Sequence, residues 1–155
     1  MPEVVISNTS PLQYLYQLGQ LDLLSRFYQH GTIPPAVADE LAAGWALGIA
    51  LPALPQVPWV QVQAPSSTQV WKVASSLGAG EREALALALT TPNALLLMDD
   101  GRGRRFGQLL GLRMTGTVGV LTPAKQEGIV SRLAPLLDHL DTLGVRLSPR
   151  LGLWP

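Results

Sequence analysis

The 155-residue sequence contains no cysteine and only two histidines, His30 and His139. Without cysteine, the chain cannot form disulfides or thiolate zinc sites, and it has no cysteine nucleophile. Two histidines also supply little material for a histidine-built zinc site or for a Ser–His catalytic pair. A hydrolytic site in this chain would therefore have to be built mainly from carboxylates.

Charged residues are scarce as well. They make up 14% of the chain, and Lys plus Arg equal Asp plus Glu at 11 each. A chain without net charge has no overall positive field, so any contact with a polyanion must come from a local patch. Hydrophobic residues make up 47%, which indicates a globular chain and excludes a disordered one.

The sequence also lacks an apolar run that could cross a membrane. Residues 41–71 contain no charged residue, but prolines interrupt them. Their most apolar part, residues 41–54, is shorter than the roughly 20 residues that a spanning helix needs. The N-terminus carries Glu3 and lacks the basic segment of a secretory signal. We therefore expect a cytoplasmic protein with no membrane partner.

Segments with strand-like patterns alternate with helix-like segments along the chain. Strands are predicted at residues 3–7, 31–33, 59–63, 94–98 and 112–115. Helices are predicted from Pro11, at residues 20–28, at 34–41, from Ser66 to near Gly78, and at 80–89, 102–110, 118–126 and 131–143. This alternation favours an α/β fold, a three-layer α/β/α sandwich with a central, mostly parallel sheet. Residues 1–155 are expected to form one domain, with an extended tail over about the last ten residues.

Polar side chains follow two of the predicted strands. Asn8 comes after the first strand, and Asp99 and Asp100 close the apolar run at 94–98. Sites in open parallel sheets form beyond the carboxyl ends of the strands. Glu40 and Glu81 lie near the starts or inner faces of helices. Carboxylates next to an apolar core resist ionisation unless a cation compensates them, so these residues predict a magnesium or manganese site that can activate water.

Each of these residues also has a purely structural interpretation. Glu81 fits the acidic residue that the helix macrodipole favours at a helix start, and Glu40 fits a solvated helix position. The aspartate pair fits a strand-to-helix turn with an N-cap, and Asn8 fits a turn residue. Individually these signals are weak, and it is their joint placement that favours a functional site.

Four segments resemble, in order and spacing, the motifs of the PIN domain family: residues 6–12, 34–41, 80–88 and 95–105. Residues 116–125 resemble the subgroup once catalogued as a domain of unknown function (DUF3368-like), which is related to the toxin halves of bacterial toxin–antitoxin pairs. The resemblance covers nearly the whole chain. It implies a metal-dependent (Mg²⁺ or Mn²⁺) endoribonuclease, often a homodimer, that cuts RNA and is inhibited by a partner antitoxin protein.

By this resemblance, the catalytic and metal-binding roles fall on Asn8, Glu40, Glu81 and Asp99, with Asp100 as neighbour or alternate ligand. Ser10 would support the first ligand by hydrogen bonding. The family usually has Asp where this chain has Asn8, and an amide oxygen can coordinate magnesium but contributes no negative charge. We expect weaker metal binding and hypothesise that activity survives on the remaining acids. The alternative is a PIN fold kept as a binding or assembly module without turnover.

Positive charge gathers directly after the aspartate pair. Arg102, Arg104 and Arg105 are placed to hold the phosphates that flank a scissile bond, although a solvated helix face gives the same pattern. The glycines of this segment superficially suggest a nucleotide-binding domain, but their spacing departs from G-x-G-x-x-G, and aspartates stand where a pyrophosphate would bind.

Two further expectations concern other folds and partners. A receiver-type signalling domain needs an acid pair early in the chain, whereas the first strand here ends at Asn8 and the pair comes late. The apolar residues 45–54 are more hydrophobic than a solvent-facing loop should be, and we expect them to form an interface with a second copy or an antitoxin.

Overall fold

The computed structural model describes residues 4–66 and 76–142. A five-stranded sheet with the order β3-β2-β1-β4-β5 lies at its centre, and every neighbouring pair of strands is parallel. The strands are β1 (Val4–Ser7), β2 (His30–Ile33), β3 (Val60–Val62), β4 (Ala94–Leu97) and β5 (Met114–Thr115). The first strand of the chain is thus the middle strand of the sheet.

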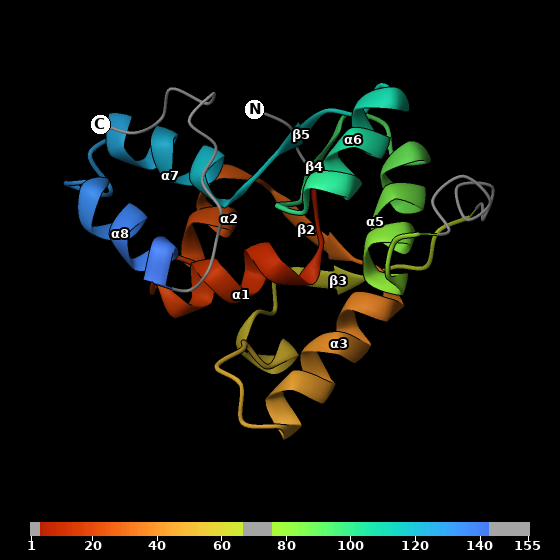
Figure 1. Cartoon of the computed structure of the whole chain (residues 1–155), viewed down its shortest axis with the longest axis horizontal. Coiled ribbons are helices and arrows are strands. Elements are labelled where there is room, and N and C mark those ends of the chain that lie inside the picture. Colours follow the sequence, from red (N-terminus) through yellow and green to blue (C-terminus); the bar gives the residue numbers. More distant parts are fainter. Residues whose placement is uncertain (1–3, 67–75, 143–155) are drawn as a thin grey trace.

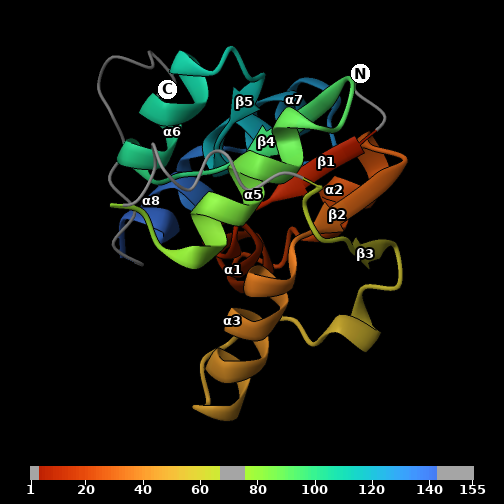
Figure 2. The ribbon, with the colours of Figure 1, turned by 90° about the vertical axis from the view of Figure 1, so that its right-hand side faces the viewer.

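Helices cover both faces of this sheet (Figures 1 and 2). They are α1 (Thr9–Gln17), α2 (Asp22–Phe27), α3 (Pro35–Ala46), α5 (Ala79–Leu89), α6 (Gly101–Leu109), α7 (Thr117–Gln126) and α8 (Ala134–Thr142), with a short 3₁₀ helix η1 (Leu54–Gln56). In Figure 1, α1, α2, α7 and α8 lie on one side of the sheet and α5 and α6 on the other, while α3 projects below the body. The predicted three-layer α/β/α architecture is confirmed.

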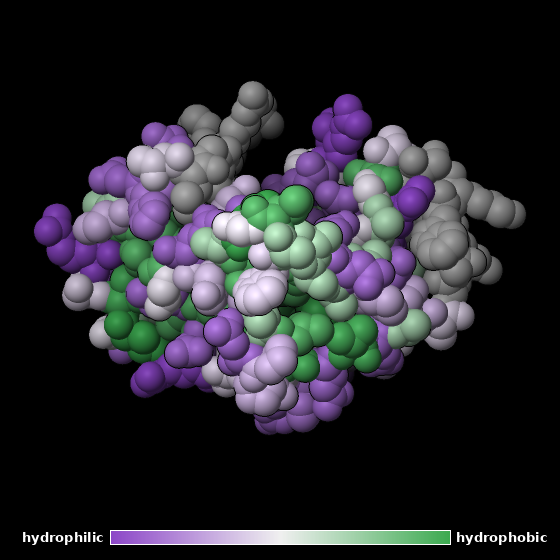
Figure 3. Space-filling view, turned by 90° about the horizontal axis from the view of Figure 1, so that it is seen from below, coloured by the Kyte–Doolittle hydropathy of each residue, from purple (hydrophilic) through white to green (hydrophobic). Residues whose placement is uncertain are grey.

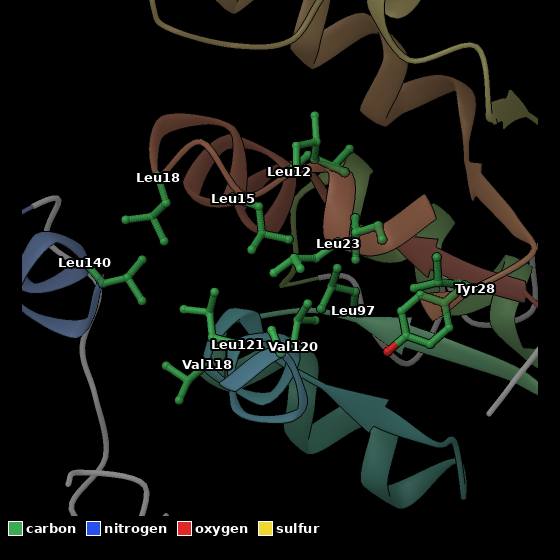
Figure 4. Packing of buried hydrophobic residues seen from close by; sticks show 14 of the residues in the cluster. Leu12, Leu15, Leu18, Leu23, Tyr28, Leu97, Val118, Val120, Leu121 and Leu140 are labelled. Carbon is green, nitrogen blue, oxygen red and sulfur yellow. The ribbon is translucent and has the colours of Figure 1, made fainter. Parts of the chain in front are cut away.

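Alternating side chains of the central strands feed two separate cores. Val5 and Leu97 pack into the larger core, with side chains from α1, α2, α7 and α8. Figure 4 shows Leu97 beside Leu15 of α1 and residues of α7. Ile6 and Leu96 point the other way and pack against α5. Because both faces of these strands are covered, their sequences are apolar at consecutive positions and do not alternate with polar residues.

Helix α5 is buried on nearly all sides, as its composition predicts. The five residues of its second and third turns, Ala84 to Ala88, are all buried. Alanine and leucine alternate through this stretch, so the small side chains let the helix lie close to the sheet while the leucines fill the core. This close packing holds the first turn of α5 near the ends of the strands.

Two predicted helices differ from the structure or lie mostly outside the residues that it describes. The helix that starts at Pro35 continues past Leu41 to Ala46, where the sequence predicts a loop. Alanines favour this extension, and Gly44 permits it because a Cβ there would collide with Leu51 of the returning chain. The helix predicted from Ser66 to near Gly78 lies mostly outside the described residues, and 76–78 form no helix before α5 begins.

The other predicted strands and helices are present, with ends that shift by one to three residues. β5 is the edge strand that the pattern at 112–115 predicts, although it is shorter. No helix within residues 4–66 and 76–142 is long and apolar enough to cross a membrane.

Candidate functional site

The carboxyl ends of β1 and β4 lie side by side at the centre of the sheet. Ser7 and Leu97 are partners in the parallel register, and the backbone N–H of Asn8 donates to the Leu97 carbonyl at 3.0 Å. The strand pairing therefore continues to Asn8, which is 3% exposed. Asn8 is the N-cap residue of α1, yet its side chain makes no capping hydrogen bond. Its amide is thus not used to start the helix.

Asp99 is held at the end of β4 by a residue from the next helix. The backbone N–H of Thr117 donates to Asp99 Oδ1 at 2.8 Å, and the Thr117 hydroxyl donates to Oδ2 at 2.6 Å. Gly116 makes room for this contact, because a Cβ at that position would lie 2.6 Å from Asp99 Oδ1. Both oxygens of the carboxylate are therefore fixed in direction.

The charge of Asp99 is only partly compensated by the protein. Burial raises the pKa of its carboxyl, whereas the two hydrogen bonds from Thr117 and the nearby positive charge of Arg104 lower it, and burial dominates. The Arg104 guanidinium also donates from Nη1 to the Met98 carbonyl at 3.1 Å, which anchors it beside the site. A carboxylate in this situation favours an additional cation.

Tyr14 of α1 belongs to the same neighbourhood. Burial raises the pKa of its hydroxyl, and the charge of Asp99 raises it further. Tyr14 therefore stays protonated at neutral pH, and its hydroxyl can donate a hydrogen bond near Asp99.

The neighbouring aspartate has a different role. Asp100 is exposed and is the N-cap residue of α6, where its Oδ2 accepts from the Gly103 N–H at 2.8 Å. The capping interpretation of the pair thus applies to Asp100, and Asp99 is the carboxylate that turns toward the strand ends. The resemblance assigned the ligand role to Asp99, with Asp100 as neighbour or alternate.

Glu40 lies between the first turns of two other helices. The Thr9 hydroxyl at the start of α1 donates to Glu40 Oε2. On the other side, a Cβ on Gly80 of α5 would lie 2.6 Å from Glu40 Oε1, so the missing side chain of Gly80 leaves the space that this carboxylate occupies. Glu40 is therefore adjacent to Asn8 through Thr9.

The two glutamates of α5 point to different neighbours. Glu81 Oε2 lies over Gly78, the N-cap residue of its own helix, where a Cβ would be 2.6 Å away. Glu83 Oε1 accepts from the Ala36 N–H at 3.1 Å and so links α5 to the start of α3. Among the described residues, no three Asp, Glu or His side chains gather as one metal-binding group.

The remaining predicted residues lie on α1 and α6. Ser10 is partly exposed in the first turn of α1. Arg104 faces Asp99, as described, whereas Arg102 and Arg105 are exposed and line a separate cavity on α6. The arginine run is thus divided between two places.

Sequence reasoning missed several partners of the acids. It assigned no role to Thr117, Thr9 or Tyr14, and Glu83 was not among its candidate residues. One signal was available for Glu83: a helix that begins with Pro34-Pro35 has its first free N–H at Ala36, and such an N–H needs an acceptor.

Comparison with known proteins gives a family and a fold. A family model described as "DUF3368: PIN domain" matches residues 4–152. Among solved structures, the chain is similar to a PilT N-terminus domain protein, SSO1118, from the hyperthermophilic archaeon Sulfolobus solfataricus P2. The two share 17% identity with a TM-score of 0.54, over 78% of this chain and 92% of the other. No curated protein matches the sequence.

Proposed function

Because the chain belongs to the PIN domain family, whose members are typically nucleases, we propose that it is a metal-dependent endoribonuclease that hydrolyses phosphodiester bonds in RNA. One observation carries this proposal. Asp99 is an oriented, incompletely compensated carboxylate at the end of an interior strand, next to the strand end that carries Asn8. The bonds from Thr117 by themselves would also suit an aspartate that caps α7, but the raised pKa beside a second polar strand end supports a site for a cation and a phosphate.

The donor chemistry suits Mg²⁺ or Mn²⁺. Both ions prefer oxygen ligands. Asp99 and Glu40 offer carboxylate oxygens, and Asn8 offers an amide oxygen. Asp99 would be the principal ligand, with the Asn8 amide oxygen and Glu40 beside it. Since the described residues include no group of three acids, the negative charge comes from fewer carboxylates than the family pattern supplies. We therefore expect weak metal binding.

When bound, a divalent ion polarises the phosphate and lowers the pKa of the attacking water. The side chains of the protein contribute orientation and charge. Thr117 prevents the Asp99 carboxylate from rotating, and Arg104 places a positive charge near Asp99 that can bind a phosphate oxygen. The protonated Tyr14 hydroxyl is a further hydrogen-bond donor in the neighbourhood of Asp99.

The test is cleavage of a mixed RNA substrate by the purified protein with Mn²⁺ or Mg²⁺, with EDTA as the metal-free control. We expect slow, metal-dependent cutting that Asp99→Ala abolishes. Asp100→Ala is the matched control, because Asp100 caps α6 and should affect stability more than chemistry. Equal loss of activity in both variants would contradict the assignment of Asp99.

A second candidate is a PIN-fold binding module without turnover. Asn8 in place of an acid, together with the absence of a three-acid group in the described residues, favours it. No cleavage by well-folded protein, even with Mn²⁺, followed by cleavage in Asn8→Asp, would identify the natural chain as this module.

A role as the toxin of a toxin–antitoxin pair extends the nuclease proposal. Expression in a bacterial host should then arrest growth, and Asp99→Asn should relieve the arrest. Growth that is unaffected by the native protein, despite demonstrated RNA cleavage in vitro, would restrict the proposal to a nuclease without toxicity.

A further inference from the structure

A cavity of about 300 Å³ runs along one face of α6, away from the larger core. Four of its lining residues, Arg102, Arg105, Phe106 and Leu109, come from α6, and Ser76 comes from the segment that leads into α5. The four α6 residues follow the spacing i, i+3, i+4, i+7, so they form one stripe on the helix. The cavity is therefore a property of this helix face.

This stripe combines positive charge with apolar surface. Arg102 and Arg105 are exposed, and α6 contains no acidic residue. Phe106 is partly buried and packs against the core beneath α5, so its ring is held in place. Leu109 is 83% exposed, although a leucine gains stability from burial. A fixed aromatic ring, an exposed leucine and two guanidinium groups thus line one hollow.

The position of α6 connects this hollow to the acidic site. The helix begins at Gly101, two residues after Asp99. The arginine end of the stripe is therefore next to the strand ends, and Leu109 lies about 10 Å further along the helix axis. Arg104 is excluded from the hollow, because it faces Asp99 and the Met98 carbonyl.

We propose that this cavity is a subsite for single-stranded RNA next to the scissile bond, an inference that rests on the proposed nuclease function. Arg102 and Arg105 bind phosphates, and a base packs on Phe106 and Leu109. Guanidinium groups match phosphate geometry, and aromatic surfaces take bases with little regard to sequence. In a duplex the bases are stacked and paired, so an apolar hollow of this kind selects an unpaired strand.

Binding of a fluorescently labelled single-stranded RNA, followed by anisotropy in EDTA, tests the subsite without requiring cleavage. The double variant Arg102→Gln/Arg105→Gln should weaken binding at least tenfold. It should also reduce the slope of log K against log salt by about 1.4, that is, about 0.7 for each lost phosphate contact. Arg132→Gln, at an exposed arginine in the loop between α7 and α8, is the matched control and should bind as the native protein does.

The apolar half of the subsite needs different variants. Phe106→Leu keeps the buried contact of the side chain but removes the aromatic ring, and Leu109→Gln changes an exposed position that carries no core packing. Both should weaken binding of the single strand without changing the salt slope, and neither should alter binding of the corresponding RNA duplex. This pattern separates base stacking from charge.

Three results would overturn the subsite. They are native binding by the double arginine variant, equal losses for single strand and duplex, and tighter binding of polyglutamate than of the RNA to the native protein. The last would identify the occupant as an acidic peptide. If the arginine dependence holds but the native protein does not cut RNA with Mn²⁺, the nuclease proposal fails, and the cavity remains a binding site for single-stranded RNA without a scissile bond beside it. If cutting occurs and the arginines have no effect, the reverse is true.

Discussion

Thr117 binds both carboxylate oxygens of Asp99, one with its backbone N–H at 2.8 Å and the other with its hydroxyl at 2.6 Å. The two residues come from different elements, since Asp99 follows β4 and Thr117 opens α7 after β5. Thr117 is fully buried, so the donor side of these bonds is shielded from water. The start of α7 therefore determines the direction in which the candidate catalytic carboxylate points.

Replacing Thr117 by valine should slow RNA cleavage at least tenfold. The substitution removes a hydrogen bond to a charged group, typically about 1.5–3 kcal/mol, while it keeps the volume of the side chain. Since the Thr117 hydroxyl lowers the pKa of Asp99, its loss should also move the acidic limb of the pH–rate profile to higher pH. Thr117→Ser keeps the hydroxyl and should resemble the native protein. Identical profiles for valine and serine would refute the positioning role.

Removing the charge of Asp99 should stabilise the metal-free protein at neutral pH. The folded state raises the pKa of this carboxyl, so ionised Asp99 is less favourable in the folded than in the unfolded chain. The destabilisation is absent below the ordinary carboxyl pKa of about 4 and is complete above the raised pKa. In Asp99→Asn, the Thr117 hydroxyl can turn to accept from the new amide, so both contacts remain.

Thermal unfolding of Asp99→Asn and native protein, measured in EDTA across pH, checks this sign. The melting temperatures should agree near pH 3 and diverge as the pH rises, with the variant the more stable. Added Mn²⁺ should raise the melting temperature of the native protein and leave that of the variant unchanged. A native protein that gains stability over the variant with rising pH would show that the charge of Asp99 is already compensated.

Asn8→Asp should strengthen metal binding on the order of tenfold, because it adds a negative charge at the end of β1. Asn8 is 3% exposed, so the new carboxylate is desolvated and should lower the melting temperature in EDTA. Added Mn²⁺ should raise the melting temperature of this variant above that of the native protein. Calorimetric titration with Mn²⁺ and melting curves with and without EDTA measure the two effects. Unchanged affinity would mean that the side chain at position 8 does not face the ion.

Gly80→Ala should separate stability from activity. Alanine at this helical position is favoured over glycine by up to about 1 kcal/mol, but its Cβ would displace the flexible end of Glu40 from its place beside Thr9. We therefore expect a melting temperature equal to or above that of the native protein and reduced cleavage. Gly101→Ala, in the first turn of α6 with open space around its Cβ position, is the control and should leave cleavage unchanged. Equal activity of the two variants would show that the position of Glu40 is not critical.

The expected homodimer remains a prediction, and the end of α3 is where it should form. Trp45, Leu47 and Ile49 are exposed there, in a stretch that has no charged residue between positions 41 and 71. Figure 3 views the molecule from this end and shows hydrophobic side chains among polar ones. Leu47→Glu should convert the dimer to a monomer in light scattering. Leu109→Glu, at a leucine with nearly the same exposure (83% against 80%), should not. A monomeric native protein would refute the homodimer and leave an antitoxin as the expected partner of this surface.

The order of the elements and the positions of the strand ends could be predicted because they depend on local patterns. The apolar run before Asp99 and the β-branched run before Asn8 each indicate a buried strand, and parallel strands bring their carboxyl ends to one edge. The α/β class, the β5 edge strand and the buried helix α5 followed from the same rules.

The partners of the acids could not be predicted, because they depend on packing between elements that are distant in the chain. Nothing local connects Thr117 with Asp99, or Thr9 with Glu40 across α2 and β2. The extension of α3 past Leu41 was missed for a similar reason. Its glycine looks like a break until Leu51 returns to pack on it.

The middle position of β1 in the sheet affects when the site can exist. β1 pairs with β2, which follows it closely in the sequence, and with β4, which is synthesised much later. Asp99 obtains its hydrogen-bond donors only when Thr117 has been added to the chain. A chain that emerges from the ribosome therefore has to be synthesised past Thr117 before these groups meet. A protein that cuts RNA would in this way remain harmless to its own message until that point of its translation.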